Sequence, residues 1–440
     1  MWNVRGLFDD SKVSRSSRPA NLLWIISMLK RIAVADLRIG MYVQEFCGSW
    51  MDHPFWKSKF LLNSPQDLQR IRASSIGELW IDVSKGLDVE AGAVVSTEAE
   101  AQKEVEATLM AAVQPRSTAL SASMDAELER AAKICARSKQ AVLSMFGDAR
   151  MGKALNFEQA ESLVEEISDS VMRHPNALIS LARLKHADEY TYMHSVAVCA
   201  LMIALARQLG LGEGAVREAG LAGLLHDVGK MAIDQDVLNK PGKLSDAEFS
   251  AVRRHPEAGG KILLAGKQVS ALVLDVCLHH HEKVDGSGYP HGLQGEQISL
   301  FARMGAVCDV YDAITSNRPY KQGWDPAESI RKMAEWKGHF DEEVFQAFVK
   351  TVGIYPVGAL VRLESGRLAV VLEQNAKSLL VPKVKAFFLA KSKVQIPPVL
   401  IDLSKANAQD RIVGRESAAA WGFEHLDELW SGMPQPRARR

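Results

Sequence analysis

The segment from His279 to Pro290 holds the densest group of chemically active side chains in the chain. It reads His-His-His-Glu-Lys-Val-Asp-Gly-Ser-Gly-Tyr-Pro, and its second half is rich in residues that end a helix. Each imidazole that is buried must find a partner, so three in succession are unfavourable without a function. His226-Asp227 upstream and Cys308-Asp309 downstream each close an apolar run. The pattern is typical of a metal site inside a helical bundle.

Seven side chains are the candidate metal ligands, all His or Asp within or beside apolar, helix-like runs: His194, His226, Asp227, His255, His280, His281 and Asp309. Imidazole and carboxylate together suit Fe, Mn, Zn, Co or Ni and argue against an oxygen-only Mg or Ca site. Asp227 is the predicted bridge between two cations, because one carboxylate can give an oxygen to each. That placement requires a helix end at His226-Asp227, which Gly229 favours.

The other histidines are expected to be structural or exposed, among them His53, His186, His339 and His425. His279 is ambiguous, because three adjacent side chains cannot face one pocket on a helix that turns about 100° per residue. We therefore favour His280 and His281 as ligands and leave His279 outside the site.

A two-metal site of this composition would activate water and hold the oxygens of a phosphoester. Asp227 and Lys230 are the predicted catalytic residues, since Lys230 lies one turn after His226 and can reach a phosphate or the leaving oxygen. Tyr289, between Gly288 and Pro290, is placed to stack on a base or to bind phosphate. Arg318 and Lys321 offer two more cations, so the predicted substrate-binding set is Lys230, Tyr289, Arg318 and Lys321.

The elements that must position these residues are mainly helices. Apolar residues recur at helical spacing over 124–146 and 157–172, and Ser245 with Glu248 forms a capping-box sequence. In the N-terminal part, short strands are expected at 32–34, 42–43 and 79–83, with a helix at 64–73. In the C-terminal part, short strands are expected at 358–363, 367–373 and 378–382. The predicted fold is mainly α, with a central all-helical bundle, a small α+β N-terminal module and a small β C-terminal appendage.

These signals divide the chain into five parts. Residues 1–30 are an uncertain leader, in which Met28 is an alternative start, and 31–90 form a regulatory α+β module. The Ala- and Glu-rich stretch 91–123 is a predicted linker. Residues 124–352 form the helical catalytic domain, and 353–440 form the β appendage with a disordered tail.

Composition excludes several classes of protein. Lys+Arg and Asp+Glu number 53 each among 440 residues, so nothing predicts nucleic-acid binding as the main activity. The five cysteines are odd in number and contain no CxxC, which favours a reducing compartment. The apolar run 22–29 is too short to span a membrane. We expect a cytoplasmic protein, and a homodimer is left open.

The motifs together resemble the HD-GYP subgroup of the HD-domain metallophosphohydrolases. The matching segments appear in the family's order across roughly 185 to 325: 188–195, 224–230, 254–257, 280–290, 307–313 and 315–321. Residues 37–43 also resemble the uncharacterised domain that often precedes HD-GYP domains in bacteria.

The resemblance implies an enzyme, a phosphodiesterase that hydrolyses the bacterial messenger cyclic di-GMP to pGpG, and in some members to GMP. It implies the same seven metal ligands and the same substrate-binding set as above. It also implies that the loop Gly288-Tyr289-Pro290 contacts GGDEF-domain proteins, as in some members.

The chain departs from the family at one position. Members with a third metal carry Glu four residues before the first ligand His, where this chain has Tyr190, with Glu189 one step away. We therefore expect two divalent metals, iron or manganese. Two other interpretations stay open: a non-catalytic cyclic di-GMP receptor or adaptor, and an HD hydrolase of another cyclic dinucleotide such as a cyclic GMP–AMP.

Overall fold

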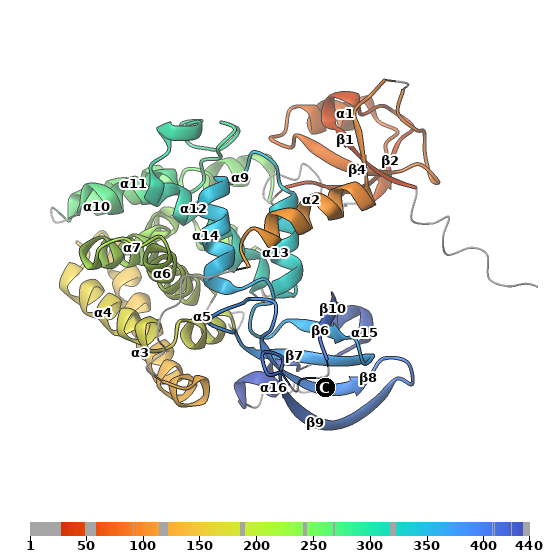
Figure 1. The fold of residues 1–440 in the computed structure, drawn as a ribbon. Helices are drawn as coiled ribbons and strands as arrows, with labels where there is room; N and C mark the ends of the chain where they lie inside the picture. Colours follow the sequence, from red (N-terminus) through yellow and green to blue (C-terminus); the bar gives the residue numbers. More distant parts are fainter. Residues whose placement is uncertain are drawn as a thin grey trace, which may run out of the picture. The chain divides into compact units, whose positions relative to one another are not determined.

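The computed structural model describes residues 28–48, 59–90, 92–113, 122–184, 190–240, 244–266, 269–316, 323–406, 408, 410–423 and 425–433. Most of the predicted leader and the tail from 434 lie outside these residues. The described residues fall into two compact units that divide between Gln102 and Lys103, drawn in Figure 1. Among the described residues, no helix has the length and apolar character needed to cross a membrane.

The first unit is an antiparallel five-stranded sheet in the order β3-β2-β4-β1-β5. Leu79 and Ile81 of the central strand join Ile71 of α1 in its apolar core. Ser64 begins α1 by accepting a hydrogen bond from the Asp67 backbone N–H. The elements are β1 (Leu29–Ala33), a 3₁₀ turn (Val34–Asp36), β2 (Tyr42–Phe46), β3 (Phe60–Leu61), α1 (Pro65–Arg72), β4 (Glu78–Asp82) and β5 (Val95–Thr97).

The stretch 91–123, predicted to be a partly helical linker, also contains a strand that joins the sheet of the first unit. Strand β5 lies inside that range and pairs with β1, Val95 opposite Ile32. Helix α2 (Glu98–Met110) follows directly, and it buries Val105 and Leu109 along one face. The high Ala and Glu content gave the appearance of a linker because it dilutes an apolar stripe that recurs every four residues.

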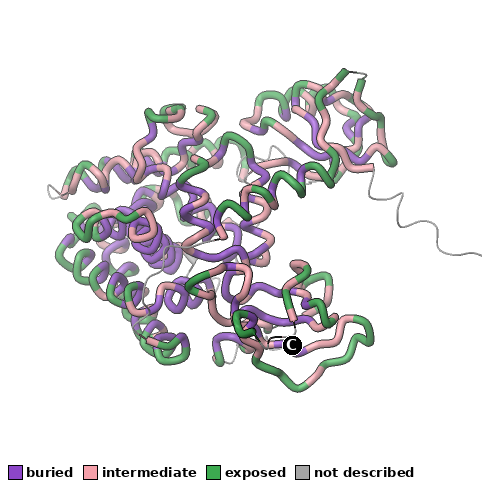
Figure 2. Tube along the Cα trace, in the orientation of Figure 1, coloured by how far each residue is buried: buried purple, intermediate pink, exposed green. Residues whose placement is uncertain are grey.

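The second unit contains a helical bundle around α6, which is apolar on nearly every side and is buried as such a helix must be. Helix α6 packs against α5, α7 and α12, and Figure 2 shows the burial along this part of the bundle. The helices are α3 (Met124–Arg150), α4 (Phe157–Arg173), α5 (Pro175–Arg183), α6 (Tyr190–Gln208), α7 (Glu213–Leu225), η4 (Val228–Ala232), α8 (Gln235–Leu238), α9 (Asp246–Val252), α10 (His255–Ala265), α11 (Ala271–His279), η5 (Gly295–Gln297), α12 (Leu300–Thr315), α13 (Pro326–Glu335) and α14 (Glu342–Val352).

The predicted capping box at the start of α9 is confirmed, since the Ser245 side chain accepts from the Glu248 N–H and Glu248 accepts from the Ser245 N–H. Between α3 and α14 the described residues contain no named strand, only an isolated bridge between Asp285 and Gln294. The mainly α fold class is confirmed.

A second antiparallel sheet, in the order β10-β6-β7-β8-β9, follows the helices. Its contacts with the helices include two hydrogen bonds: Asp325 at the start of α13 accepts from the Leu360 N–H, and Arg183 of α5 donates to the Val357 carbonyl. Its elements are β6 (Leu360–Leu363), β7 (Arg367–Glu373), β8 (Lys383–Leu389), β9 (Val394–Asp402), β10 (Ile412–Arg415), α15 (Ala418–Trp421) and α16 (Asp427–Ser431).

The predicted strand at 378–382 is wrong. The Asn375 side chain accepts from the N–H groups of Lys377 and Ser378 and bends the chain there. The third strand, β8, starts only at Lys383, directly after Pro382, which has no N–H for a ladder.

Candidate metal centre

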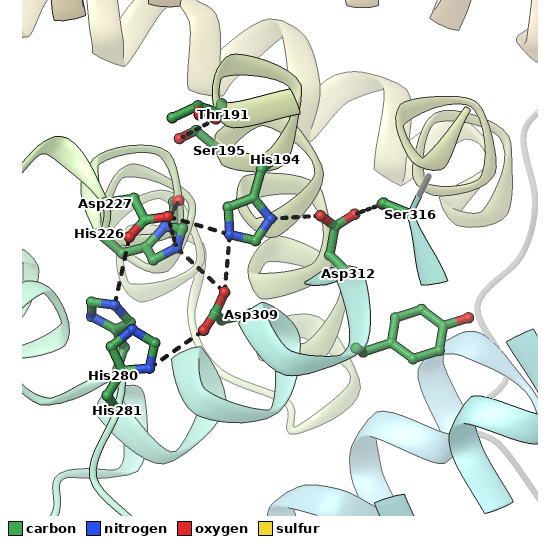
Figure 3. Close-up of polar contacts among 12 residues, drawn as sticks. Thr191, His194, Ser195, His226, Asp227, His280, His281, Asp309, Asp312 and Ser316 are labelled. Carbon is green, nitrogen blue, oxygen red and sulfur yellow. Dashed lines mark hydrogen bonds and ion pairs between the residues drawn. The ribbon is translucent and has the colours of Figure 1, made fainter. Parts of the chain in front are cut away.

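Five parts of the bundle bring the seven candidate ligands together. His194 comes from α6, His226 and Asp227 from the turn after α7, and Asp309 from α12. His255 opens α10, while His280 and His281 follow the end of α11. All are buried at 4% exposure or less, except His281, which is partly exposed. Figure 3 shows His194, Asp227 and Asp309 converging from different helices.

Two groups of ligands form the centre. One contains His194, His226 and Asp227, the other His255, His280 and His281, and each has its donor atoms close enough to hold one cation. Asp227 lies between the groups, since its Oδ2 is 3.4 Å from His194 Nε2 and its Oδ1 is 3.3 Å from His255 Nε2.

Asp309 lies between the same two groups. Its Oδ1 is 2.9 Å from His194 Nε2 and its Oδ2 is 3.7 Å from His281 Nδ1. Both carboxylates therefore span the two ligand groups, whereas the sequence pattern had singled out Asp227 alone as the residue between them.

In four of the histidines, Nδ1 contacts a carbonyl or carboxylate oxygen, which leaves Nε2 facing the centre. His226 Nδ1 donates to the Gly223 carbonyl and His255 Nδ1 to the Val252 carbonyl, both at 2.8 Å. His280 Nδ1 lies 3.0 Å from the Val276 and Cys277 carbonyls. His194 Nδ1 is 2.6 Å from an Asp312 carboxylate oxygen. Such outer contacts fix the tautomer and orientation of a metal-binding imidazole.

Adjacent residues can serve one centre here because the helices end at those positions. Helix α7 ends at Leu225 and α11 at His279, so His226-Asp227 and His280-His281 both lie in turns. His279, still in the helix, lies outside the centre and pairs with Asp275 at 2.8 Å.

A close backbone approach joins the two groups. Gly229 in η4 packs directly on the start of α10, and a Cβ there would collide with the His255 carbonyl oxygen and Gly259 N. Gly259 is equally confined, since its Cβ would lie 2.6 Å from Cys277 Sγ. Without side chains at these two positions, η4 and α10 approach closely enough for Asp227 to reach His255.

The protonation states suit metal binding. Burial lowers the pKa of His255 to about 4 and that of His280 to about 3, and it lowers the pKa of His281 well below its usual range. Burial opposes ionisation of Asp227, but Lys230 and His226 outweigh it and hold its pKa well below the usual range. Neutral imidazoles and ionised carboxylates are the forms that bind metals.

His226 behaves differently from the other ligands. Burial lowers the pKa of its imidazole, but the charges of Asp227 and Asp309 outweigh this and raise the pKa to about 10. The two carboxylates thus favour the protonated form of His226 in the absence of metal. A bound cation would replace that proton.

Unsatisfied polar atoms provide a direct test of the fit to a metal. His226 Nε2 and Asp227 Oδ1 are buried and have no hydrogen-bond partner, a condition that native proteins avoid unless a ligand or ion completes the site. Nitrogen and oxygen donors in this proportion fit Fe, Mn or Zn. The residues present fit a metal centre.

The predicted substrate-binding residues are only partly described. Lys230 forms a close ion pair with Asp227. Tyr289 stacks on His281, with ring centres 4.7 Å apart and planes at 25°. Arg318, Lys321 and Glu189 lie outside the described residues.

The loop that carries Tyr289 is fixed by its own residues. The buried Glu282 carboxylate accepts hydrogen bonds from the N–H groups of His291 and Leu293. Gly288 lies so close to the backbone of Glu282 and Lys283 that any Cβ would collide with it. This contact explains why glycine precedes Tyr289.

Two residues were missed at the sequence level. Asp312, which holds His194, comes one turn after Asp309 on α12, and its i+3 spacing was the available signal. Arg253 places its guanidinium over the Tyr289 ring, 4.4 Å from its centre. No pattern could predict that contact, because it joins two separate loops.

Comparisons with known proteins agree with this architecture. Residues 29–160 match the family model "Domain of unknown function (DUF3391)", and residues 165–344 match the model "HD domain". The chain is 64% identical to the "Cyclic di-GMP phosphodiesterase PA4108" of Pseudomonas aeruginosa over 92% of this chain and 96% of that protein.

Two further relatives match the HD region. The "Cyclic di-GMP phosphodiesterase response regulator RpfG" of Xanthomonas campestris pv. campestris is 39% identical over 45% of this chain and 53% of that protein. The "3'3'-cGAMP-specific phosphodiesterase 1" of Vibrio cholerae is 34% identical over 42% of each chain. The fold and the His/Asp centre are those of an HD-domain phosphohydrolase. The chain belongs to the HD-GYP subgroup of this family, with a DUF3391 domain preceding the HD domain.

Proposed function

We propose that this chain is a metal-dependent phosphodiesterase that hydrolyses cyclic di-GMP to pGpG, and to GMP when the second phosphodiester is also cleaved. The observation that carries the proposal is the buried His/Asp centre, in which His226 Nε2 and Asp227 Oδ1 lack partners while Asp227 and Asp309 each span two ligand groups. The relatives at 64% and 39% identity are both named as cyclic di-GMP phosphodiesterases, which supports the choice of substrate.

The cofactor is proposed as two divalent cations, iron or manganese, held by the seven residues of the centre. The residues that would hold them are the groups His194, His226 and Asp227 and His255, His280 and His281, with Asp309 within reach of both groups. When bound, such cations supply the Lewis acidity that promotes attack by water on phosphorus.

The chain's own residues then orient the reaction. In hydrolysis, water forms the new P–O bond, the bond from phosphorus to the ribose 3′ oxygen breaks, and that oxygen takes up a proton. Lys230, held at the centre by Asp227, offers its ammonium group to the phosphate or to the leaving oxygen. Tyr289, whose ring lies against both His281 and Arg253, can offer its phenolic hydroxyl to a phosphate of the substrate.

The test is to load anaerobically purified full-length protein with ferrous iron or manganese and to follow cyclic di-GMP by chromatography. We expect pGpG or GMP from the wild type, and neither products nor bound metal from Asp227→Ala. The matched control is His279→Ala, which removes a neighbouring histidine that lies outside the centre and should keep activity. Wild-type turnover in Asp227→Ala would refute the assignment.

A second candidate, hydrolysis of a cyclic GMP–AMP, has one observation in its favour, the relative named for 3′3′-cGAMP. Parallel assays with both dinucleotides decide between them by the ratio of kcat/KM. Tight binding of cyclic di-GMP without products would instead establish the receptor function. Contact of the Gly288–Pro290 loop with GGDEF-domain proteins remains a proposal that a pull-down with and without Tyr289→Ala would test.

A further inference from the structure

Arg253 places a cation at the exposed edge of the metal centre. It lies in the short turn between α9 and α10, two residues before His255, and is exposed. Its guanidinium carbon is 4.4 Å from the centre of the Tyr289 ring, and that ring stacks on His281. Among the seven candidate ligands His281 is the one that is partly exposed, so these three side chains lie where the centre meets solvent.

The charge of Arg253 is not neutralised by the described part of the chain, where no carboxylate forms an ion pair with it. Lys230, the other described cation at the centre, is paired with Asp227. An exposed arginine would ordinarily extend into water, whereas this one lies over an aromatic ring, an arrangement worth about 0.5–1 kcal/mol at exposed sites. A guanidinium that contacts a ring through its carbon can keep N–H groups available for hydrogen bonds to a phosphate.

A cyclic dinucleotide carries two phosphodiesters, each with one negative charge. If the metal ligands and Lys230 receive the phosphodiester that is cleaved, the second charge must be met elsewhere. We propose that Arg253 binds the phosphodiester of the substrate that is not being cleaved. This inference rests on the proposed function and adds a substrate-binding residue to it.

The neighbouring residue provides a matched control. Arg254 is exposed in the same turn and carries the same charge, but the described residues show no ring contact or ion pair for its side chain. Arg253→Ala and Arg254→Ala therefore remove equal charge from adjacent positions, and only the first removes the group over Tyr289.

The test compares steady-state kinetics of these variants and Arg253→Lys on metal-loaded protein. Its substrates are cyclic di-GMP, cyclic di-AMP and bis(p-nitrophenyl) phosphate, which has a single phosphodiester. For Arg253→Ala we expect KM for cyclic di-GMP to rise about 10–100-fold, the size of a charge-assisted contact, with kcat changed much less. The KM of Arg253→Lys should lie between those of the wild type and Arg253→Ala, because lysine keeps the charge but lacks the two-pronged guanidinium.

Equilibrium binding provides a readout that does not depend on turnover. For the metal-free protein, measured in the presence of a chelator, the dissociation constants of Arg253→Ala for both cyclic dinucleotides should rise by similar factors. Those of Arg254→Ala should match the wild type. KM for bis(p-nitrophenyl) phosphate should rise far less than that for cyclic di-GMP.

Four results would overturn the inference. If Arg253→Ala loses affinity for cyclic di-GMP but not for cyclic di-AMP, Arg253 recognises the guanine base. If its KM for bis(p-nitrophenyl) phosphate rises equally, Arg253 only supports Tyr289. Equal behaviour of the Arg253 and Arg254 variants, with an active wild type, would refute the inference alone. A wild type that neither binds nor cleaves cyclic dinucleotides would refute the proposed function and the inference together.

Discussion

Glu127 and Asp227 are both buried carboxylates in the same helical bundle, but they differ in how far the chain satisfies their hydrogen bonds. Glu127 of α3 is fully paired: its Oε1 accepts from Ser170 Oγ at 2.8 Å and from Arg173 Nη2 at 2.9 Å, and its Oε2 accepts from Arg173 Nε at 2.8 Å. Asp227 pairs with Lys230 through Oδ2, whereas its Oδ1 is buried without a hydrogen-bond partner and faces the His255 ring at 3.3 Å.

This difference separates a structural buried charge from a functional one. The bidentate arginine and the serine compensate Glu127 for the loss of water within the chain itself. Around Asp227 the near neighbours are imidazoles, of which His255 and His280 have pKa values lowered by burial. Lys230 compensates Oδ2 by charge, whereas these two neutral rings cannot do so for Oδ1, so a bound cation is the group that would complete that oxygen.

The largest expected effect is the loss of metal and turnover in Asp227→Asn. The substitution keeps the shape but removes a bridging charge, so kcat/KM should fall by more than about 100-fold, beyond the 10–100-fold typical of outer contacts to a metal ligand. Metal analysis and chemical denaturation of the metal-free protein measure both sides of the comparison. A loss of stability as large as that expected for Glu127→Ala would show that Asp227 is also a structural carboxylate.

Asp312→Asn should have the next largest effect on function. Asp312 holds His194 Nδ1 at 2.6 Å, and loss of its charge should lower metal affinity and turnover by about 10–100-fold. Metal titration of the purified variant checks this. Unchanged metal affinity would show that Asp312 belongs with Glu127 as a structural carboxylate.

Glu127→Ala should destabilise the protein without altering its chemistry. It leaves Arg173 without its buried partner, and because Arg173 is itself partly exposed the loss should be about 2–3 kcal/mol, below the range for fully buried pairs. The measurement is urea denaturation, together with kcat per mole of folded protein. The control is Glu129→Ala, an exposed glutamate on the same helix, which should change stability by less than about 0.5 kcal/mol.

The smallest expected effect is in the pH dependence of stability. Burial opposes ionisation of Glu127, but the hydrogen bonds from Arg173 and Ser170 outweigh it and lower its pKa. The folded pKa lies below the unfolded value, so this stabilisation is fully present above about pH 4.5 and is lost as pH falls through the folded pKa. The stability difference between wild type and Glu127→Gln should therefore be constant above pH 5 and shrink by about 1 kcal/mol toward pH 3. A difference that grows on acidification would contradict the assignment.

The convergence of the candidate ligands could be predicted from sequence because each is a polar residue at an apolar helix or its end, where burial demands a partner. Asp312 carries the same signal, but its role emerges only when α12 is placed beside α6. Strand β5 was hidden by the Ala- and Glu-rich composition of the predicted linker. The start of β8 was misplaced because the turn at Asn375 depends on a side-chain contact with the backbone. The stacking of Arg253 on Tyr289 depends on how two loops meet, which no local pattern contains.

The contact between Gly229 and Gly259 has a consequence for how this centre can change over evolution. Because the two ligand groups are brought together by main chain against main chain, their separation does not depend on the size of any side chain between them. Sequence drift in the surrounding apolar core can alter stability while leaving the spacing of the ligands intact. Substitution of Gly229, in contrast, would force η4 and α10 apart and move both ligand groups at once, so this position tolerates less variation than its lack of functional atoms would suggest.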